Sequence, residues 1–197
     1  MYPKSLKNLI ESFKLLPGIG EKTAERLAFS VLDMEEENVA FFSEQLKDAK
    51  NNIKNCEICN SLTEDNVCEI CNDESRNDIL CVVEDPKNVF VFEKTGLFRG
   101  KYHVLKGLIS PLDGLNPEDI GLDKLIDRIK KEKYKEVIVA VKPSIEGETT
   151  ALYIKSILED LNIVVSKIAS GVPMGADMEY IDTMTLERAL EDRKRME

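Results

Sequence analysis

Hydrophobic side chains recur with a helical period in two short stretches near the start of the chain. Within each stretch, apolar residues are spaced three and four positions apart, as on one face of an amphipathic helix. These residues are Leu6, Leu9, Ile10 and Phe13, then Ala24, Leu27, Ala28 and Val31. The segment Leu15–Gly20 separates the two stretches, and its proline and two glycines do not continue a helix. We therefore predict two helices joined by a tight turn.

A third helical stripe follows and predicts a longer helix from about Met34 to Asn55. Asp33 with Glu36 fits a capping box at the start of this helix. The apolar stripe comprises Val39, Phe42, Leu46, Ala49 and Ile53. The chain up to residue 55 is therefore expected to be helical.

From residue 79 onward, short apolar runs alternate with helical stripes. The runs predict strands at Ile79–Val83, Val89–Phe92, Tyr102–Leu105, Val137–Val141 and Ile163–Ile168. The stripes predict helices around Leu122–Ile129, around Ile154–Leu161 and after Asp182, which is placed to cap the last one. The fourth run is continuously apolar, as is typical of a strand buried on both faces, and we expect the fifth to be a buried strand as well. Strands separated by crossover helices indicate a mostly parallel α/β sheet.

Two identical Cys-x-x-Cys pairs stand between the helical and the α/β parts. Cys56 and Cys59 form the first pair, and Cys68 and Cys71 form the second after eight intervening residues. Four thiolates at this spacing are typical of a tetrahedral Zn²⁺ site, and a shell closed by four sulfurs is structural. Two disulfides or a redox pair are the alternatives, but no signal peptide precedes the segment, and a reducing cytosol would keep the thiols free. Cys81 lies in an apolar run and is expected to be a small buried hydrophobe.

Composition sets limits on location and partners. The chain has 197 residues, of which 43% are hydrophobic, so it can form a core. It contains no apolar run near the ~20 residues that cross a bilayer, and we expect a cytoplasmic protein without membrane contact. The net charge of −10 argues against a general electrostatic attraction to nucleic acid. Any DNA binding must therefore be local.

The turn between the first two helices is the candidate for such local binding. Helix, Gly-x-Gly turn, helix is the pattern of a helix-hairpin-helix. Gly18 and Gly20 let the backbone approach a phosphate, and free N–H groups of the second helix can donate to it. Lys22 and Arg26 are four residues apart and share one helix face. An ordinary helical hairpin is the alternative, but the Pro-Gly-Ile-Gly-x-Lys pattern favours phosphate binding with little sequence preference.

Acidic residues follow two of the predicted strands. Glu84 comes after the first strand, and Glu146 and Glu148 come shortly after Val137–Val141. Since function gathers at the carboxyl ends of parallel strands, converging carboxylates there could hold Mg²⁺. The alternative is that they only favour the start of the following helices. His103 is the one histidine and has no partner at a motif spacing, so we predict a strand residue and no catalytic base.

Taken in order, these motifs resemble the bacterial recombination mediator family RecR. The matching segments are Leu16–Arg26, the four cysteines, Cys81–Pro86, Tyr102–Gly107, Ser110–Gly114, Ile145–Ala151 and Gly171–Gly175 with Glu179, Tyr180, Thr185 and Leu186. Two positions depart from the family pattern. Lys142 stands where asparagine is usual, which weakens an Mg²⁺ interpretation, and Ala176 stands where glycine is common.

The resemblance implies a fold of several parts. These are a helix-hairpin-helix DNA-binding region at residues 1–55, a four-cysteine zinc finger at 56–71, a Toprim domain at 79–174 and a C-terminal helical segment at 175–197. The expected fold class is thus multidomain, α and α/β, with a Toprim-like parallel sheet flanked by helices.

The resemblance also implies a non-enzymatic function in DNA repair and recombination. Family members form ring-shaped tetramers that can encircle single- or double-stranded DNA. They act with the RecO and RecF proteins to load recombinase on single-stranded DNA. Glu84, Glu146 and Glu148 are then expected to form a contact surface for partners or DNA. The alternatives are an Mg²⁺-dependent Toprim phosphoryl-transfer enzyme, primase-like or nuclease-like, that uses the same three acids, and a pure protein-interaction scaffold.

Overall fold

The computed structural model describes residues 2–169 and 171–193. The chain divides into two compact units, Met1–Ile53 and Lys54–Glu197, each described by itself below. No helix in the described ranges is long and apolar enough to cross a membrane.

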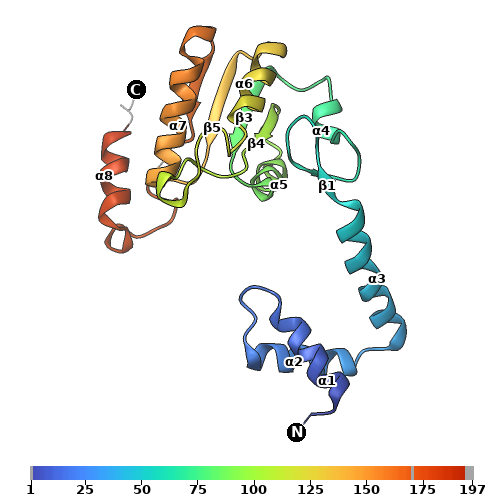
Figure 1. The fold of residues 1–197 in the computed structure, drawn as a ribbon. Helices are drawn as coiled ribbons and strands as arrows, with labels where there is room; N and C mark the ends of the chain where they lie inside the picture. The colour runs from blue at the N-terminus through green and yellow to red at the C-terminus, as the bar shows by residue number, and fades with distance from the viewer. Residues whose placement is uncertain (1, 170, 194–197) are drawn as a thin grey trace. The chain divides into compact units, whose positions relative to one another are not determined.

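The first unit contains the predicted helical hairpin. Helix α1 spans Lys4–Lys14 and helix α2 spans Glu21–Leu32 (Figure 1). They pack through a small core made of Leu6, Ile10, Ala24 and Ala28. The two alanines present no side chain beyond Cβ, so the helices approach closely. The prediction of two amphipathic helices and a turn is confirmed.

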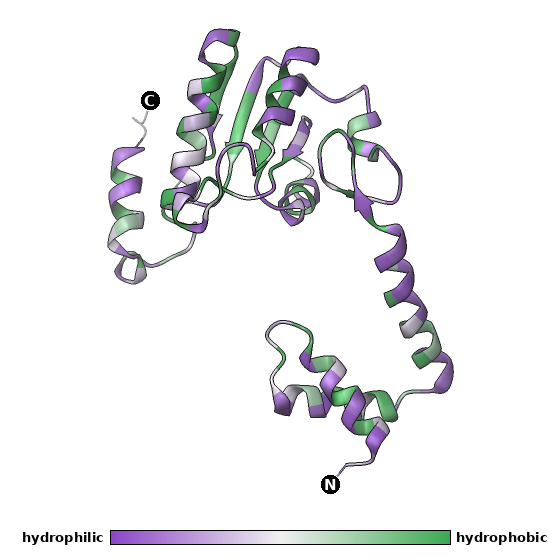
Figure 2. Ribbon diagram, in the orientation of Figure 1, coloured by the Kyte–Doolittle hydropathy of each residue, from purple (hydrophilic) through white to green (hydrophobic). Residues whose placement is uncertain are grey.

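Helix α3 differs from its prediction at both ends. It spans Glu36–Asn52, and its N-cap is Glu35, with no side-chain cap bond. The predicted capping box of Asp33 and Glu36 is therefore wrong. The reason is that Asp33 ends α2 in a helical conformation, whereas an N-cap residue needs an extended backbone. Figure 2 shows apolar and polar residues along α3. None of the side chains of this fully described helix is buried.

The second unit is built on a four-stranded parallel sheet. Its strands are β3 Ile79–Val83, β4 Lys101–Val104, β5 Glu136–Ala140 and β6 Val164–Lys167, in the order β4-β3-β5-β6. The main helices are α5 Pro86–Thr95, α6 Leu122–Lys131, α7 Ile145–Leu158 and α8 Thr183–Glu191. Short 3₁₀ segments lie at Pro111–Asp113, Glu159–Leu161 and Met178–Tyr180. The predicted parallel α/β architecture is confirmed.

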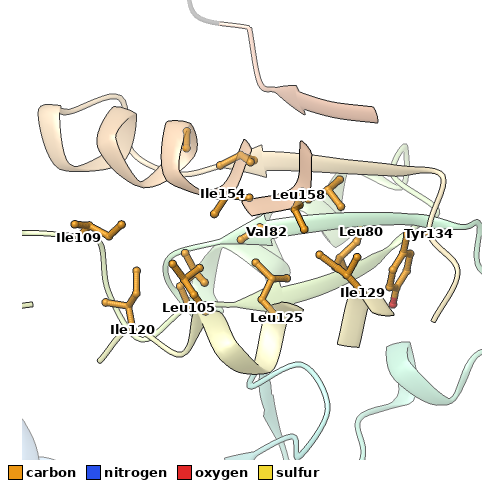
Figure 3. Packing of buried hydrophobic residues seen from close by; sticks show 14 residues of the cluster. Leu80, Val82, Leu105, Ile109, Ile120, Leu125, Ile129, Tyr134, Ile154 and Leu158 are labelled. Carbon is orange, nitrogen blue, oxygen red and sulfur yellow. The ribbon is translucent and has the colours of Figure 1, made fainter. Parts of the chain in front are cut away.

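Side chains alternate between the two faces of β3. Leu80 and Val82 pack with Leu125 of α6 and Ile154 of α7 in the larger core (Figure 3). Cys81 and Val83 point to the other face and join a smaller core with residues of α5 and β4. Because both faces are covered, β3 is apolar throughout, and the prediction of a buried Cys81 is confirmed.

Two strand predictions need correction. The run Val89–Phe92 is helical and belongs to α5. A complete capping box starts this helix: the Asp85 carboxylate accepts the Lys87 N–H at 2.8 Å, and the Asn88 side chain accepts the Asp85 N–H at 3.2 Å. Pro86, with its fixed φ, occupies the first helical position. These signals outweigh the strand preference of four apolar residues.

The second correction concerns Ile163–Ile168, predicted as a buried strand. The strand present, β6, is shorter and lies at the edge of the sheet. Val164 is 63% exposed, and no residue of β6 is fully buried. An apolar run alone does not distinguish an edge position from a central one. The predicted N-cap of the last helix is confirmed, since the Asp182 carboxylate accepts the Thr185 N–H at 3.0 Å.

Candidate metal centre and nucleic-acid interface

The four cysteines come together in a small module that we call the zinc knuckle, residues 54–72. It contains strands β1 Lys54–Asn55 and β2 Leu62–Thr63 and the short helix α4 Glu69–Asn72. All four side chains are buried, and their Sγ atoms lie within 4.8 Å of one another. Tetrahedral Zn²⁺ with Zn–S bonds of about 2.3 Å needs sulfur atoms about 3.8 Å apart, and the cluster fits this geometry.

Backbone donors in the zinc knuckle also suit thiolates. The Cys68 N–H points to Cys56 Sγ at 3.3 Å, and the Ser61 N–H points to Cys59 Sγ at 3.5 Å. Without a cation, the hydrogen bond between Cys59 and Cys68, followed by burial, raises the pKa of the Cys59 thiol. A bound divalent cation reverses this preference, because it stabilises the thiolates directly. The residues fit a structural zinc ion, as predicted.

The zinc knuckle is attached to one edge of the parallel sheet. The Val104 N–H of β4 donates to the Cys59 carbonyl at 2.8 Å. The Asn60 side chain donates to the Val104 carbonyl at 3.1 Å, from a residue in the left-handed conformation with φ 63°. The turn that carries the first cysteine pair therefore continues the hydrogen bonding of the sheet.

The hairpin of the first unit presents an uncapped helix end. Gly18 has φ +81°, which glycine adopts without strain, and Gly20 is the N-cap of α2 with an extended backbone. Among the described residues, no side chain caps this end of α2. A Cβ atom added at either glycine has no neighbouring heavy atom within 4 Å. The first-turn N–H groups of α2 are therefore open to an external acceptor.

The charged residues around this helix end differ in their partners. Lys14 lies 2.6 Å from Glu21 and 3.1 Å from Glu11, and hydrogen bonding to Glu21 raises the pKa of Lys14. Lys22 and Arg26 are exposed, and neither pairs with a carboxylate of residues 2–169 or 171–193. The nearby carboxylate is thus engaged by Lys14, and two cations on α2 remain available for a ligand.

The three predicted acids occupy the carboxyl edge of the sheet without forming a metal site. Glu84 Oε2 accepts the Lys142 backbone N–H at 3.1 Å. Glu148 accepts from Lys167 at 3.0 Å, and this hydrogen bond lowers the pKa of Glu148. A hydrogen bond from Ser144 likewise lowers the pKa of Glu146. Within the described part of the chain, the only residue group arranged to hold a metal is the set of four cysteines.

Two residues of this region escaped the sequence analysis. Lys167 at the end of β6 and Arg188 of α8 both reach Glu148, Arg188 at 3.2 Å. Both line a cavity of about 690 Å³ that also includes Lys142 and Ser144. Lys167 lies near the end of the predicted strand Ile163–Ile168, and its position at a carboxyl end was an available signal. No pattern in the sequence near Arg188 indicated its contact with Glu148, which lies forty residues away in the chain.

Comparison with known proteins gives matches along the whole chain. Four family models match in order: the RecR helix-hairpin-helix at residues 6–50, the RecR zinc finger domain with four cysteines at 53–73, the Toprim domain at 78–169 and the RecR C-terminal model at 171–194. The chain is 47% identical over 196 residues to "Recombination protein RecR" of Staphylococcus haemolyticus, covering 99% of both chains. It is 46% identical over 196 residues to the protein of that name from Natranaerobius thermophilus, covering 99% of this chain and 98% of the relative. The chain belongs to the RecR family of recombination proteins.

Proposed function

We propose that this protein is a DNA repair and recombination mediator that binds DNA and does not catalyse a reaction. The observation that carries the proposal is the uncapped N-terminus of α2 at Gly20, next to the exposed side chains of Lys22 and Arg26, which pair with no carboxylate among the described residues. Backbone N–H groups and two cations together suit the oxygens of a DNA phosphate. Family membership supports the same function.

Binding of this kind is local and independent of sequence. The net charge of −10 gives no general attraction to DNA, so the positive contacts must be concentrated at the hairpin. Contacts to phosphate position a protein without reading base edges. The protein therefore binds single- and double-stranded DNA with little sequence preference and with a marked dependence on salt.

The hydrogen bonds and ion pairs of the predicted acidic residues support a non-catalytic role. Mg²⁺-dependent phosphoryl transfer needs carboxylates that converge on the ion. Here Glu148 is paired with Lys167 and Arg188, and Glu84 accepts a backbone N–H from Lys142. We assign Glu84, Glu146 and Glu148 to a surface that contacts partner proteins or DNA.

The partners and the assembly follow from the family resemblance. The protein acts with RecO and RecF to load recombinase on single-stranded DNA, as a tetrameric ring around the DNA in the cytoplasm. Exposed large apolar side chains on the first unit support burial against other chains, among them Leu15, Leu16, Phe29, Leu32, Phe41 and Phe42. The division at residues 1–55, 56–71, 79–174 and 175–197 stays a prediction, and residues 194–197 lie outside the described ranges.

DNA binding at several salt concentrations tests the proposal. The double variant Lys22→Ala, Arg26→Ala should weaken binding to both DNA forms and reduce the salt slope of the association constant by about 2, because two phosphate contacts are lost. Lys4→Ala with Lys7→Ala is the matched control, since it removes the same charge from the exposed start of α1. Equal effects in both double variants reduce the role of Lys22 and Arg26 to net charge and argue against a specific phosphate site at the start of α2.

A further inference from the structure

A buried arginine lies between the zinc knuckle and the parallel sheet. The side chain of Arg128, from α6, is only 5% exposed. Its Nη2 group points to Cys71 Sγ at 3.8 Å, within the range of an N–H···S hydrogen bond. Its Nη1 group donates to the Tyr102 carbonyl of β4, and its Nε group donates to Glu132 at 3.1 Å. The guanidinium thus contacts the zinc ligand Cys71, the strand residue Tyr102 and Glu132, which follows α6.

The remaining surroundings of Arg128 hold the guanidinium in place. Its central carbon lies 5.7 Å from the centre of the Tyr134 ring, a cation–π distance. Glu132 accepts a hydrogen bond from the Tyr134 hydroxyl as well. A planar guanidinium with donors fixed in a fork is suited to such a site, because its bonds leave in set directions.

A second cation reaches the same cysteine. Lys101 of β4 donates from Nζ to the Cys71 carbonyl at 3.2 Å, and its Nζ lies 3.9 Å from Glu132. Zn²⁺ bound by four thiolates carries a net charge of −2. Burying that charge is costly unless opposite charge lies close by. Arg128 and Lys101 supply two positive charges on one side of the zinc cluster, and Glu132 neutralises one of them.

We propose that Arg128 is a positioning residue of the zinc centre, which compensates the thiolate charge at Cys71 and couples zinc binding to attachment of the zinc knuckle on the sheet. The contact is indirect, since Arg128 reaches the metal through a ligand. Partners that orient ligands in this way contribute about 10–100-fold to metal affinity. Such coupling is reciprocal. If attachment of the zinc knuckle to the sheet raises zinc affinity through Arg128, bound zinc strengthens that attachment by the same factor.

A purely structural role for Arg128 makes a different prediction. Its bonds to Tyr102 and Glu132 could stabilise the fold whether or not zinc is bound. In that case, loss of the guanidinium lowers stability equally with and without the metal. Arg76 offers the matched control, because its side chain is 11% exposed and pairs with Glu93 at 2.6 Å. Its other described partners are the Gly100 carbonyl and, at 3.5 Å, the carboxylate of Asp73, and neither of these groups is a zinc ligand.

Zinc affinity of the full-length protein, measured by competition with a chelator, tests the proposal. We expect Arg128→Gln to lower the affinity about 10-fold or more, and Arg128→Lys to lower it less because a positive charge remains. Arg76→Gln should leave zinc affinity unchanged even if it lowers stability. Equal affinity in Arg128→Gln and the unaltered protein, or an equal loss in the Arg76 variant, overturns the proposal.

Thermal unfolding with and without zinc supplies a second readout. Zinc removal should lower the melting temperature of the unaltered protein and of Arg76→Gln by similar amounts, and that of Arg128→Lys by less. If Arg128→Gln does not fold, Arg128→Lys carries the test, since it keeps the charge and most of the side-chain volume. The coupling is refuted if zinc removal lowers the melting temperature of Arg128→Lys as much as that of the unaltered protein and the zinc affinity of the variant is also unchanged.

Discussion

Arg188 of α8 donates to the Glu148 carboxylate of α7 at 3.2 Å and so ties the C-terminal helix to the carboxyl edge of the sheet. Both side chains are partly exposed, and such pairs contribute up to about 1 kcal/mol. We therefore predict that Arg188→Ala changes global stability little but increases hydrogen exchange of α8 amides. Glu187→Ala on the same helix is the control. Unchanged exchange in α8 after Arg188→Ala shows that the ion pair does not hold the helix.

The free space around Gly20 gives a sharp test of phosphate binding at the backbone. Gly20 has φ −87° and no heavy atom within 4 Å of an added Cβ, so Gly20→Ala should fold with nearly unchanged stability. A methyl group at this N-cap nevertheless lies where a phosphate approaches α2. We expect a DNA affinity reduced about 10-fold or more, equivalent to ~1.4 kcal/mol, by fluorescence anisotropy.

Gly18 provides the contrasting variant. Its φ of +81° disfavours any side chain, so Gly18→Ala should lower the free energy of unfolding by about 1–2 kcal/mol. A Gly20→Ala protein that is stable and binds DNA normally argues against backbone contact with phosphate. A Gly20→Ala protein as destabilised as Gly18→Ala means that the added methyl group is not accommodated as expected.

The one histidine of the chain predicts a pH dependence of stability. His103 is 3% exposed, and its Nδ1 has no partner among the described residues. Burial, and secondarily the charges of Arg128 and Lys124, lowers the pKa of His103 to about 3. The unfolded chain, with a histidine pKa near 6.5, therefore binds the proton first. This contribution to stability is complete above pH 6.5 and is lost as the pH falls below it, by up to about 1.4 kcal/mol per pH unit.

Nuclear magnetic resonance of the imidazole ring checks this directly. In the folded protein, the ring signals should stay constant from pH 7 to pH 5, whereas the urea-unfolded protein should titrate near pH 6.5. In denaturant unfolding, His103→Gln should remove the corresponding slope between pH 5 and pH 6.5. A folded-state titration near neutral pH contradicts a buried neutral imidazole.

Cys81 should be distinguishable from the zinc ligands by its reactivity. Burial raises the pKa of the Cys81 thiol to about 12, so at pH 8 only about one thiol in 10⁴ is ionised. We predict that chelation of zinc makes four cysteines reactive toward an alkylating reagent while Cys81 stays protected until the sheet unfolds. Mass spectrometry of the alkylated peptides measures this. Early labelling of Cys81 shows that its position in the core opens without global unfolding.

Local signals accounted for most of the fold. The spacing of the four cysteines was sufficient to predict the zinc site, because a tetrahedral ion imposes its geometry on a short segment. Alternating apolar runs and stripes likewise predicted the parallel sheet, since each strand covered by helices must be apolar. The α5 helix was missed because four apolar residues satisfy either period, and only the Asp85–Asn88 capping box decides between them.

Side-chain contacts between residues far apart in the sequence could not be predicted from such local patterns. Glu148 was correctly placed at the carboxyl edge, but its pairing with Lys167 and Arg188 depends on how β6 and α8 return to that edge. Arg128 carries a charge at the border of an apolar helix stripe, where sequence alone predicts an exposed side chain. It is buried because the zinc knuckle covers that position and supplies Cys71 as an acceptor.

The attachment of Cys59 and Asn60 to Val104 bears on solubility. An uncovered strand edge is a template for pairing with other chains, and proteins protect such edges or keep them short. At one side of this sheet, β6 has only four residues. At the other side, the zinc knuckle occupies hydrogen-bonding groups of β4. We therefore expect loss of zinc to uncover this edge of β4 and to favour self-association.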